Sequence, residues 1–240
     1  MVNHRYQLEE YKSDSFNIQP DFRYQFGAVL TYTASERFSV HTELNFERIG
    51  KTLKNDDGKL PVVFSKTRFS FLSVPLILRV NFGNSPVQYY VNGGPKISFW
   101  MTGSGKLRDL DEFQEFFGPD YELNYDIVFR QSQESRNDDG TQGNLAITDA
   151  NRIQYALTLG GGANFSLANG ARIMVDLRYS FGHSNMGFNG NPSFQFIGYE
   201  ENFEYTHDML SVSVGYLFEY NAQLQRKGRS TNKLSNKKNR

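Results

Sequence analysis

The sequence predicts an all-β protein, an eight-stranded antiparallel up-and-down transmembrane β-barrel whose first strand is truncated or lies at the extreme N-terminus. Three observations lead to this fold class. Seven stretches alternate apolar and polar residues, which is the period of a β-strand. The connections between them are alternately short and long. Phe and Tyr gather at the strand ends, as in the aromatic girdles of membrane barrels.

The strands are predicted, in chain order, at 22–32, 38–49, 67–82, 87–101, 153–167, 171–183 and 207–220. Each is long enough for a tilted membrane strand of roughly 9–11 residues. In the sixth strand, Ile173, Val175 and Leu177 share one face, whereas Asp176 and Arg178 share the other. The apolar faces of other strands carry Phe38, Val40, Leu44 and Phe46, then Val74, Leu76, Leu78, Val80 and Phe82, then Ile153, Tyr155, Leu157 and Leu159, and finally Leu210, Val212, Val214, Tyr216 and Phe218.

The connections predict the orientation and the strand count. The segments 33–37, 83–86 and 168–170 are tight turns, and 50–66, 103–150 and 184–205 are long loops. In bacterial barrels the short turns lie in the periplasm and the long loops face outward, so the C-terminus is expected in the periplasm. A barrel with both ends there needs an even number of strands, so an eighth strand should precede Phe22.

The period of two alone does not decide which face is buried, since a soluble barrel or sandwich has the same period with the faces exchanged. Strand length, loop asymmetry and the aromatic strand ends favour the membrane barrel. The expected interface aromatics are Phe22, Tyr24, Tyr32, Phe82, Tyr89, Phe99, Phe181, Phe218 and Tyr220.

Composition excludes several classes of protein and site. The 240 residues include no cysteine, so no disulfide, thiol nucleophile or Cys-based zinc site is available. No run of 18 apolar residues exists that could form a membrane-spanning helix. A weak calcium-loop pattern at 135–146 lacks both essential carboxylates, and no cofactor or metal ligand is predicted. The first five residues begin no secretory signal, so a signal was removed or the start is truncated.

The formal net charge of zero conceals an acidic loop and a basic tail. Residues 104–150 hold eleven acidic and four basic side chains, whereas residues 221–240 hold seven basic side chains and no acid. We therefore expect two regions, the barrel at 1–220 and a basic periplasmic tail at 221–240. The simplest interpretation of the tail is a solvated, disordered chain end without a binding role.

The segment Phe71-Leu-Ser-Val-Pro-Leu-Ile-Leu-Arg79 resembles the signature of the PorT-like outer-membrane β-barrel family of Bacteroidota. Tyr90-Val-Asn-Gly-Gly-Pro-Lys96 and the strands around 157–165 and 177–181 are similar to later strands of that family. Ser73 replaces the usual acidic residue. The resemblance implies an eight-stranded outer-membrane barrel, and one branch of the family is implicated in type IX protein secretion.

Pro75 lies inside this segment and removes a hydrogen-bond donor from the strand. A ladder tolerates such a loss at a bulge or an edge. A bulge near Ser73 would also reconcile the unclear alternation around Phe69, Phe71 and Leu72.

The polar faces predict a network of charges inside the barrel. An eight-stranded barrel is just filled by its side chains, so inward charges should pair with each other rather than line a water channel. The candidate members are Glu43, Glu47, Arg79, Lys96, Asp176, Arg178 and Glu219.

Two further regions are candidates for contact with other envelope proteins. The 104–150 loop offers extracellular aromatics at Phe113, Phe116, Phe117, Tyr121 and Tyr125. The tail offers periplasmic cations at Arg226, Lys227, Arg229, Lys233, Lys237, Lys238 and Arg240. Outer-membrane lipid is the other expected partner, and nucleic acid is not expected in that compartment.

The leading functional prediction is a non-enzymatic, integral outer-membrane barrel that serves as a structural or interaction subunit of the envelope, linked to secretion or assembly machinery. The alternative is an outer-membrane hydrolase or acyltransferase. Its candidate groups at the rim are Ser180, His183, Ser184, His207 and Asp208, although nothing in the sequence arranges them as a catalytic set. A narrow channel is disfavoured by the charged, crowded interior.

Overall fold

The computed structural model describes residues 2–6, 16–20, 24–55, 63–83, 86–107, 122–129, 142–147, 150–187, 194–196, 199–201 and 205–218. All regular elements in these ranges are β-strands. Within the same ranges, no helix has the length and apolarity needed to cross a membrane.

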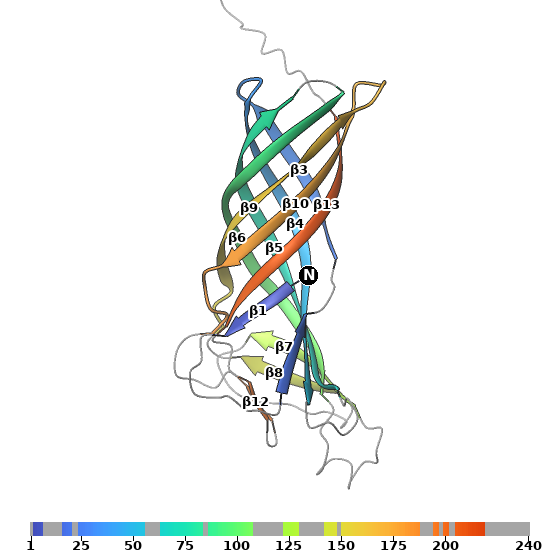
Figure 1. Ribbon diagram of the computed structural model, residues 1–240. Helices are drawn as coiled ribbons and strands as arrows, with labels where there is room; N and C mark the ends of the chain where they lie inside the picture. Colours follow the sequence, from blue (N-terminus) through green and yellow to red (C-terminus); the bar gives the residue numbers. More distant parts are fainter. Residues whose placement is uncertain are drawn as a thin grey trace, which may run out of the picture.

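Seven long strands form the wall, and all seven were predicted from the alternation. They are β3 (Gln25–Thr33), β4 (Phe38–Asn55), β5 (Val63–Phe82), β6 (Val87–Leu107), β9 (Ile153–Ser166), β10 (Arg172–Gly182) and β13 (Tyr205–Leu217). Each pairs antiparallel with its neighbour, in the order β13-β10-β9-β6-β5-β4-β3. The strands tilt around a common axis, so the sheet curls into a barrel (Figure 1).

The eighth strand, β1 (Val2–Tyr6), lies at the extreme N-terminus of the chain. It pairs antiparallel with β13, with Val2 opposite Met209 and Tyr6 opposite Tyr205. The sheet closes along a seam between β13 with β1 at one margin and β3 at the other. Beyond the part of β13 that β1 covers, Gln25 Nε2 of β3 donates a hydrogen bond to Ser213 Oγ of β13 at 2.8 Å. The two margins of the curled sheet therefore meet, as the prediction of an eight-stranded barrel requires.

The two ends of the barrel differ, as the alternation of short and long connections predicted. At one end, named here the short-turn end, tight turns join β3 to β4, β5 to β6 and β9 to β10 (Figure 1). Gly83 and Gly170 adopt φ of 82° in two of these turns, a conformation that favours glycine. In the last turn, Leu167 N donates to Ala171 O at 2.8 Å and closes the hairpin.

At the opposite end, named here the long-loop end, the wall continues beyond the predicted strand boundaries. β4, β5 and β6 extend to Asn55, Val63 and Leu107. The short strand β2 (Phe16–Pro20) pairs with the β4 extension. β7 (Leu123–Phe129) pairs with β6, and β8 (Gln142–Ile147) pairs parallel to β7. A separate two-stranded sheet consists of β11 (Phe194–Phe196) and β12 (Tyr199–Glu201).

The predicted bulge near Ser73 is wrong in position. Ser73 pairs in register with Ser98, and the register of the β5–β6 ladder shifts instead between Ser70 and Phe71. The extra residue is Met101 on β6, because Trp100 faces Phe71 and Thr102 faces Ser70. Pro75 stays in the β5–β6 ladder, opposite Lys96. The β4–β5 ladder skips Val74 and Pro75, between the pairs Asn45–Ser73 and Thr42–Leu76, and the Pro75 carbonyl accepts a hydrogen bond from Thr42 Oγ1 at 3.0 Å.

The two faces of the wall have the polarity that a membrane barrel requires. Leu78, Val212 and Val214 are 67%, 70% and 74% exposed on the outside, whereas Ile77 and Arg79, the neighbours of Leu78, are buried. Other outward, exposed side chains include Leu30, Tyr32, Phe82, Tyr89, Val91, Phe99, Tyr155, Leu157, Leu159, Leu177, Phe181 and Phe218. An apolar band of this extent on a folded protein indicates contact with an apolar phase. Of the nine predicted interface aromatics, Phe22 and Tyr220 lie outside the described residues, and the other seven are exposed.

Candidate functional site

The strongest concentration of charge is inside the barrel, around Arg178 of β10. Its Nη2 lies 2.6 Å from Glu43 Oε1 of β4, and its Nε contacts Asp176 Oδ1 on the same strand. Asp176 and Arg178 face the same way because they are two residues apart on one strand. One guanidinium therefore neutralises two carboxylates that come from different strands.

Asp176 has three further polar neighbours. Tyr90 Oη donates to Asp176 Oδ2 at 2.7 Å, and Asn92 Nδ2 donates to the same oxygen at 2.9 Å. Arg79 Nη2 lies 3.7 Å from that oxygen, and the Arg79 guanidinium carbon is 3.7 Å from the centroid of the Tyr90 ring. This carboxylate is buried, so the donors around it replace the water that would otherwise solvate it.

Glu43 has two further polar partners on its own strand, β4. His41 Nε2 and Glu43 Oε1 are 2.8 Å apart, and Asn45 Nδ2 donates to Glu43 Oε2 at 2.6 Å. His41 Nδ1 is in turn 2.8 Å from Thr31 Oγ1. We name the set Glu43, Arg79, Asp176 and Arg178, with these polar neighbours, the Arg178 cluster.

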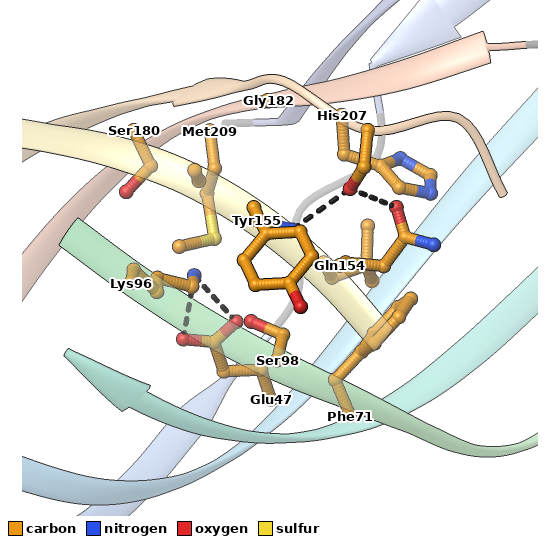
Figure 2. Close-up of a pocket in the computed structure, with 13 residues that line it drawn as sticks. Glu47, Phe71, Lys96, Ser98, Gln154, Tyr155, Ser180, Gly182, His207 and Met209 are labelled. Carbon is orange, nitrogen blue, oxygen red and sulfur yellow. Dashed lines mark hydrogen bonds and ion pairs between the residues drawn. The ribbon is translucent and has the colours of Figure 1, made fainter. Parts of the chain in front are cut away.

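A second ion pair lies nearer the long-loop end. Lys96 Nζ of β6 contacts both carboxylate oxygens of Glu47 of β4, at 2.9 and 2.8 Å, and both side chains are buried (Figure 2). The pair lines a cavity of about 40 Å³, together with residues that include Phe71, Ser98, Gln154 and His207. That volume is far below the several hundred cubic ångströms typical of ligand pockets.

Aromatic rings crowd the interior beyond this cavity. The Phe69 ring contacts Trp100 edge-on at 5.4 Å between centroids, and Phe71 stacks on Trp100 at 6.3 Å. The His207 ring lies 5.9 Å from Phe69 and 6.0 Å from Phe71. Phe69, Phe71 and Trp100 are almost fully buried, so this packing narrows the lumen at the long-loop end.

The structure brings together six of the seven predicted interior charges, in two groups. Glu43, Arg79, Asp176 and Arg178 lie in the Arg178 cluster, Glu47 and Lys96 form the separate pair, and Glu219 lies outside the described residues. Sequence reasoning missed the part played by Tyr90 and Asn92. The signal was available, because both lie at even positions of β6, in phase with the inward-facing Lys96.

Tyr125 corrects one prediction for the 104–150 loop. It was expected to offer an extracellular contact, but its side chain is 4% exposed and its Oη is 2.8 Å from Thr67 Oγ1. The ring turns inward because Tyr125 stands opposite Gly105 on β6, which leaves room beside the wall. Phe113, Phe116, Phe117 and Tyr121, and the tail cations Arg226, Lys227, Arg229, Lys233, Lys237, Lys238 and Arg240, lie outside the described residues.

The rim residues considered for catalysis contact other partners. Ser180 Oγ is 3.0 Å from Thr158 Oγ1, and Ser184 Oγ donates to Gln154 Oε1 at 2.9 Å. Asp208 accepts from Tyr179 Oη and from Gly182 N, both at 3.1 Å. His207 Nε2 faces Met186 Sδ, and His183 is exposed. These contacts join neighbouring strands to one another. Among the described residues, no group of three or more His, Asp or Glu side chains is arranged to hold a metal ion.

Two glycines of β9 make room for the Arg178 cluster. A Cβ at Gly162 would lie 2.5 Å from Tyr90 Oη, and one at Gly160 would lie 2.7 Å from Arg178 Cγ. Both would also meet backbone carbonyl oxygens of β10, at 2.1 and 2.3 Å. Backbone atoms cannot withdraw as a flexible side chain can, so these two positions require glycine.

Replacing Gly162 with valine is therefore expected to destabilise the barrel by about 1–3 kcal/mol, the usual cost of overpacking a filled core. The new side chain would displace Tyr90 from Asp176. Urea titration of the folded barrel in lipid vesicles measures the effect. Ala163→Val is the matched control, because residue 163 faces the opposite side of the same strand. Equal stability of the two variants would show that the interior next to Gly162 is not filled.

An antiparallel sheet curled on itself, with an apolar exterior and buried ion pairs in its interior, defines a transmembrane β-barrel. The family model of the outer membrane protein beta-barrel domain matches residues 2–187, and the chain belongs to this family. It is therefore an integral barrel of the bacterial outer membrane. Comparison with curated proteins found no match, and comparison with solved structures also found none.

Proposed function

We propose that this barrel is a non-enzymatic structural or interaction subunit of the cell envelope. In this proposal the long-loop end faces outward, and the short-turn end and the C-terminus lie in the periplasm. Because the segment 71–79 resembles the PorT-like signature, we extend the proposal to protein-secretion (type IX) or assembly machinery of Bacteroidota.

The filled lumen is the observation that carries this proposal. The Arg178 cluster links β4, β5, β6 and β10 across the interior, and the Lys96–Glu47 pair and the ring packing around Trp100 follow it toward the long-loop end. The cavity between the Lys96–Glu47 pair and the ring packing has a volume of only about 40 Å³. We infer that this interior does not conduct solutes, so any work done by the barrel is expected at its two ends.

The long-loop end offers the larger surface for contact. β4, β5 and β6 extend at the long-loop end beyond the rest of the wall, and β2, β7 and β8 add strands to this extension (Figure 1). Phe113, Phe116, Phe117 and Tyr121 remain proposed contacts on this side, and the basic residues of 221–240 remain proposed contacts on the other.

Affinity purification from native membranes in mild detergent tests the interaction role. We expect a reproducible complex with the full chain, and its loss when either 108–121 or 221–240 is deleted. The two deletions report separately on the two ends, and retained heat-modifiable migration shows that each variant still folds. A lone barrel in every preparation would contradict the proposal. Discrete single-channel current steps in planar bilayers would contradict it as well.

The contacts of the rim residues favour the non-enzymatic role over the enzymatic alternative. Ser180, Ser184 and Asp208 each hydrogen-bond to groups of neighbouring strands or connections. Esterase, acyl-transfer and protease assays on the purified barrel are expected to be negative. Activity that disappears in Ser184→Ala would support the alternative.

A further inference from the structure

A second hollow lies at the long-loop end, against the wall formed by β5, β6 and β7. Its volume is about 490 Å³, and it is lined mainly by Lys66, Arg68, Ser104, Lys106, Asn124 and Asp126. It is thus in the size range of sites that hold small molecules or headgroups, unlike the cavity beside Lys96.

Strand register places these polar side chains on one face of the three strands. Lys66 stands directly opposite Lys106, and Arg68 stands opposite Ser104. On the next ladder, Asn124 and Asp126 stand opposite Lys106 and Ser104. This shared face is named here the cationic cleft.

The cationic cleft faces outward from the barrel. Its residues on β5 alternate with Thr67 and Phe69, which are buried toward the interior. They share their face with Leu72 and Val74, which are 38% and 45% exposed. On β6, Phe99 and Met101 are also exposed, at 42% and 43%, next to the cleft on its membrane side. The cleft therefore begins where the outward apolar band ends.

The charges of the cleft favour an anion. Three of its lining residues are cationic and only Asp126 is acidic. Like charges directly opposite one another, as at Lys66 and Lys106, destabilise a strand pair unless something neutralises them. Glu122 Oε2 lies 3.1 Å from Lys106 Nζ, but the two side chains are 37% and 53% exposed. An exposed pair of this kind is weak and can be exchanged for another anion.

We propose that the cationic cleft binds the phosphate groups of a phosphorylated glycolipid in the outer leaflet, while Leu72, Phe99 and Met101 contact its acyl chains. An arginine and two lysines on adjacent strands suit phosphate oxygens. Their place at the edge of the apolar band is the height of a lipid headgroup. The assignment to the outer leaflet rests on the proposed outward orientation of the long-loop end.

Native mass spectrometry of the full chain in detergent tests the site, with lipid A as the probe and dephosphorylated lipid A as its matched comparison. We expect Lys66→Gln/Arg68→Gln to bind lipid A about tenfold more weakly than the unaltered barrel. Arg37→Gln/Arg172→Gln removes the same charge at the short-turn end, far from the cleft, and should bind normally. Dephosphorylated lipid A should bind the unaltered barrel and the cleft variant equally.

Equal affinity of the cleft variant and the unaltered barrel for lipid A would overturn the proposal. So would displacement of lipid A by millimolar inorganic phosphate, since the cleft would then be a site for free anions. Orientation is tested separately, by labelling a His183→Cys variant with an impermeant maleimide on intact cells, because His183 is exposed at the long-loop end and lies outside the cleft. The protein has no cysteine, so this thiol is unique. Failure to label would contradict the proposed orientation, whereas the binding assay in detergent does not depend on it.

Discussion

Replacing Arg178 with methionine is expected to lower the free energy of unfolding by about 3–5 kcal/mol, the cost of removing one partner from a buried ion pair. Arg178 touches Glu43 at 2.6 Å and also contacts Asp176, and all three side chains lie inside the barrel. Without the guanidinium, Glu43 and Asp176 lose a cationic partner while both remain inside the barrel. Urea titration in lipid vesicles, followed by the fluorescence of the single tryptophan, Trp100, measures the loss.

Companion variants separate the ion pairs from the side-chain volume. Glu43→Gln together with Asp176→Asn removes both acids, so adding these changes to Arg178→Met should recover much of the lost stability. Arg37→Met, at an exposed position in a short turn, should change stability little. A loss below about 1 kcal/mol in Arg178→Met would mean that water reaches the Arg178 cluster. That result would contradict an interior closed to water and solutes.

The wall could be predicted from the sequence because strand alternation is a local property. Leu78 and Arg79 are adjacent in the chain and face lipid and lumen, so residue type alone assigns the faces. The far ends of β4, β5 and β6 could not be predicted in this way. Their extensions depend on pairing with β2 and β7, which are distant in sequence, rather than on any local pattern.

The members of the interior network could be predicted, but their partners could not. Alternation places Lys96 and Glu47 inside, yet they meet only because the stagger of β4, β5 and β6 brings them to one height. Arg178 of β10 meets Glu43 of β4 across the interior, because the curled sheet brings these two strands, which are not neighbours, to face each other. The bulge was predicted at the wrong position, near Ser73 instead of at Met101, for a related reason. Pro75 suggested an irregularity by its missing donor, whereas the shift occurs where Trp100 enters the ring packing.

Replacing Leu76 with arginine is expected to destabilise the barrel by about 2–4 kcal/mol, the cost of a cation near the middle of the hydrocarbon layer. Leu76 is 53% exposed on the outward face of β5, and the neighbouring outward residues Val74 and Leu78 are also apolar and exposed. The long side chain would have to bend toward an interface that lies several residues away in either direction. The same urea titration in lipid vesicles measures the effect.

Phe82→Arg provides the depth control for this prediction. Phe82 is also 53% exposed on the outward face of β5, but it is the last residue of the strand, at the short-turn end. An arginine there can reach water, so the expected cost falls to about 0–1 kcal/mol. Because the two positions are equally exposed on one strand, the difference between them reports mainly their depth in the membrane. Equal costs would mean that the band around Leu76 does not lie in hydrocarbon, and the assignment of the outward face to lipid would fail.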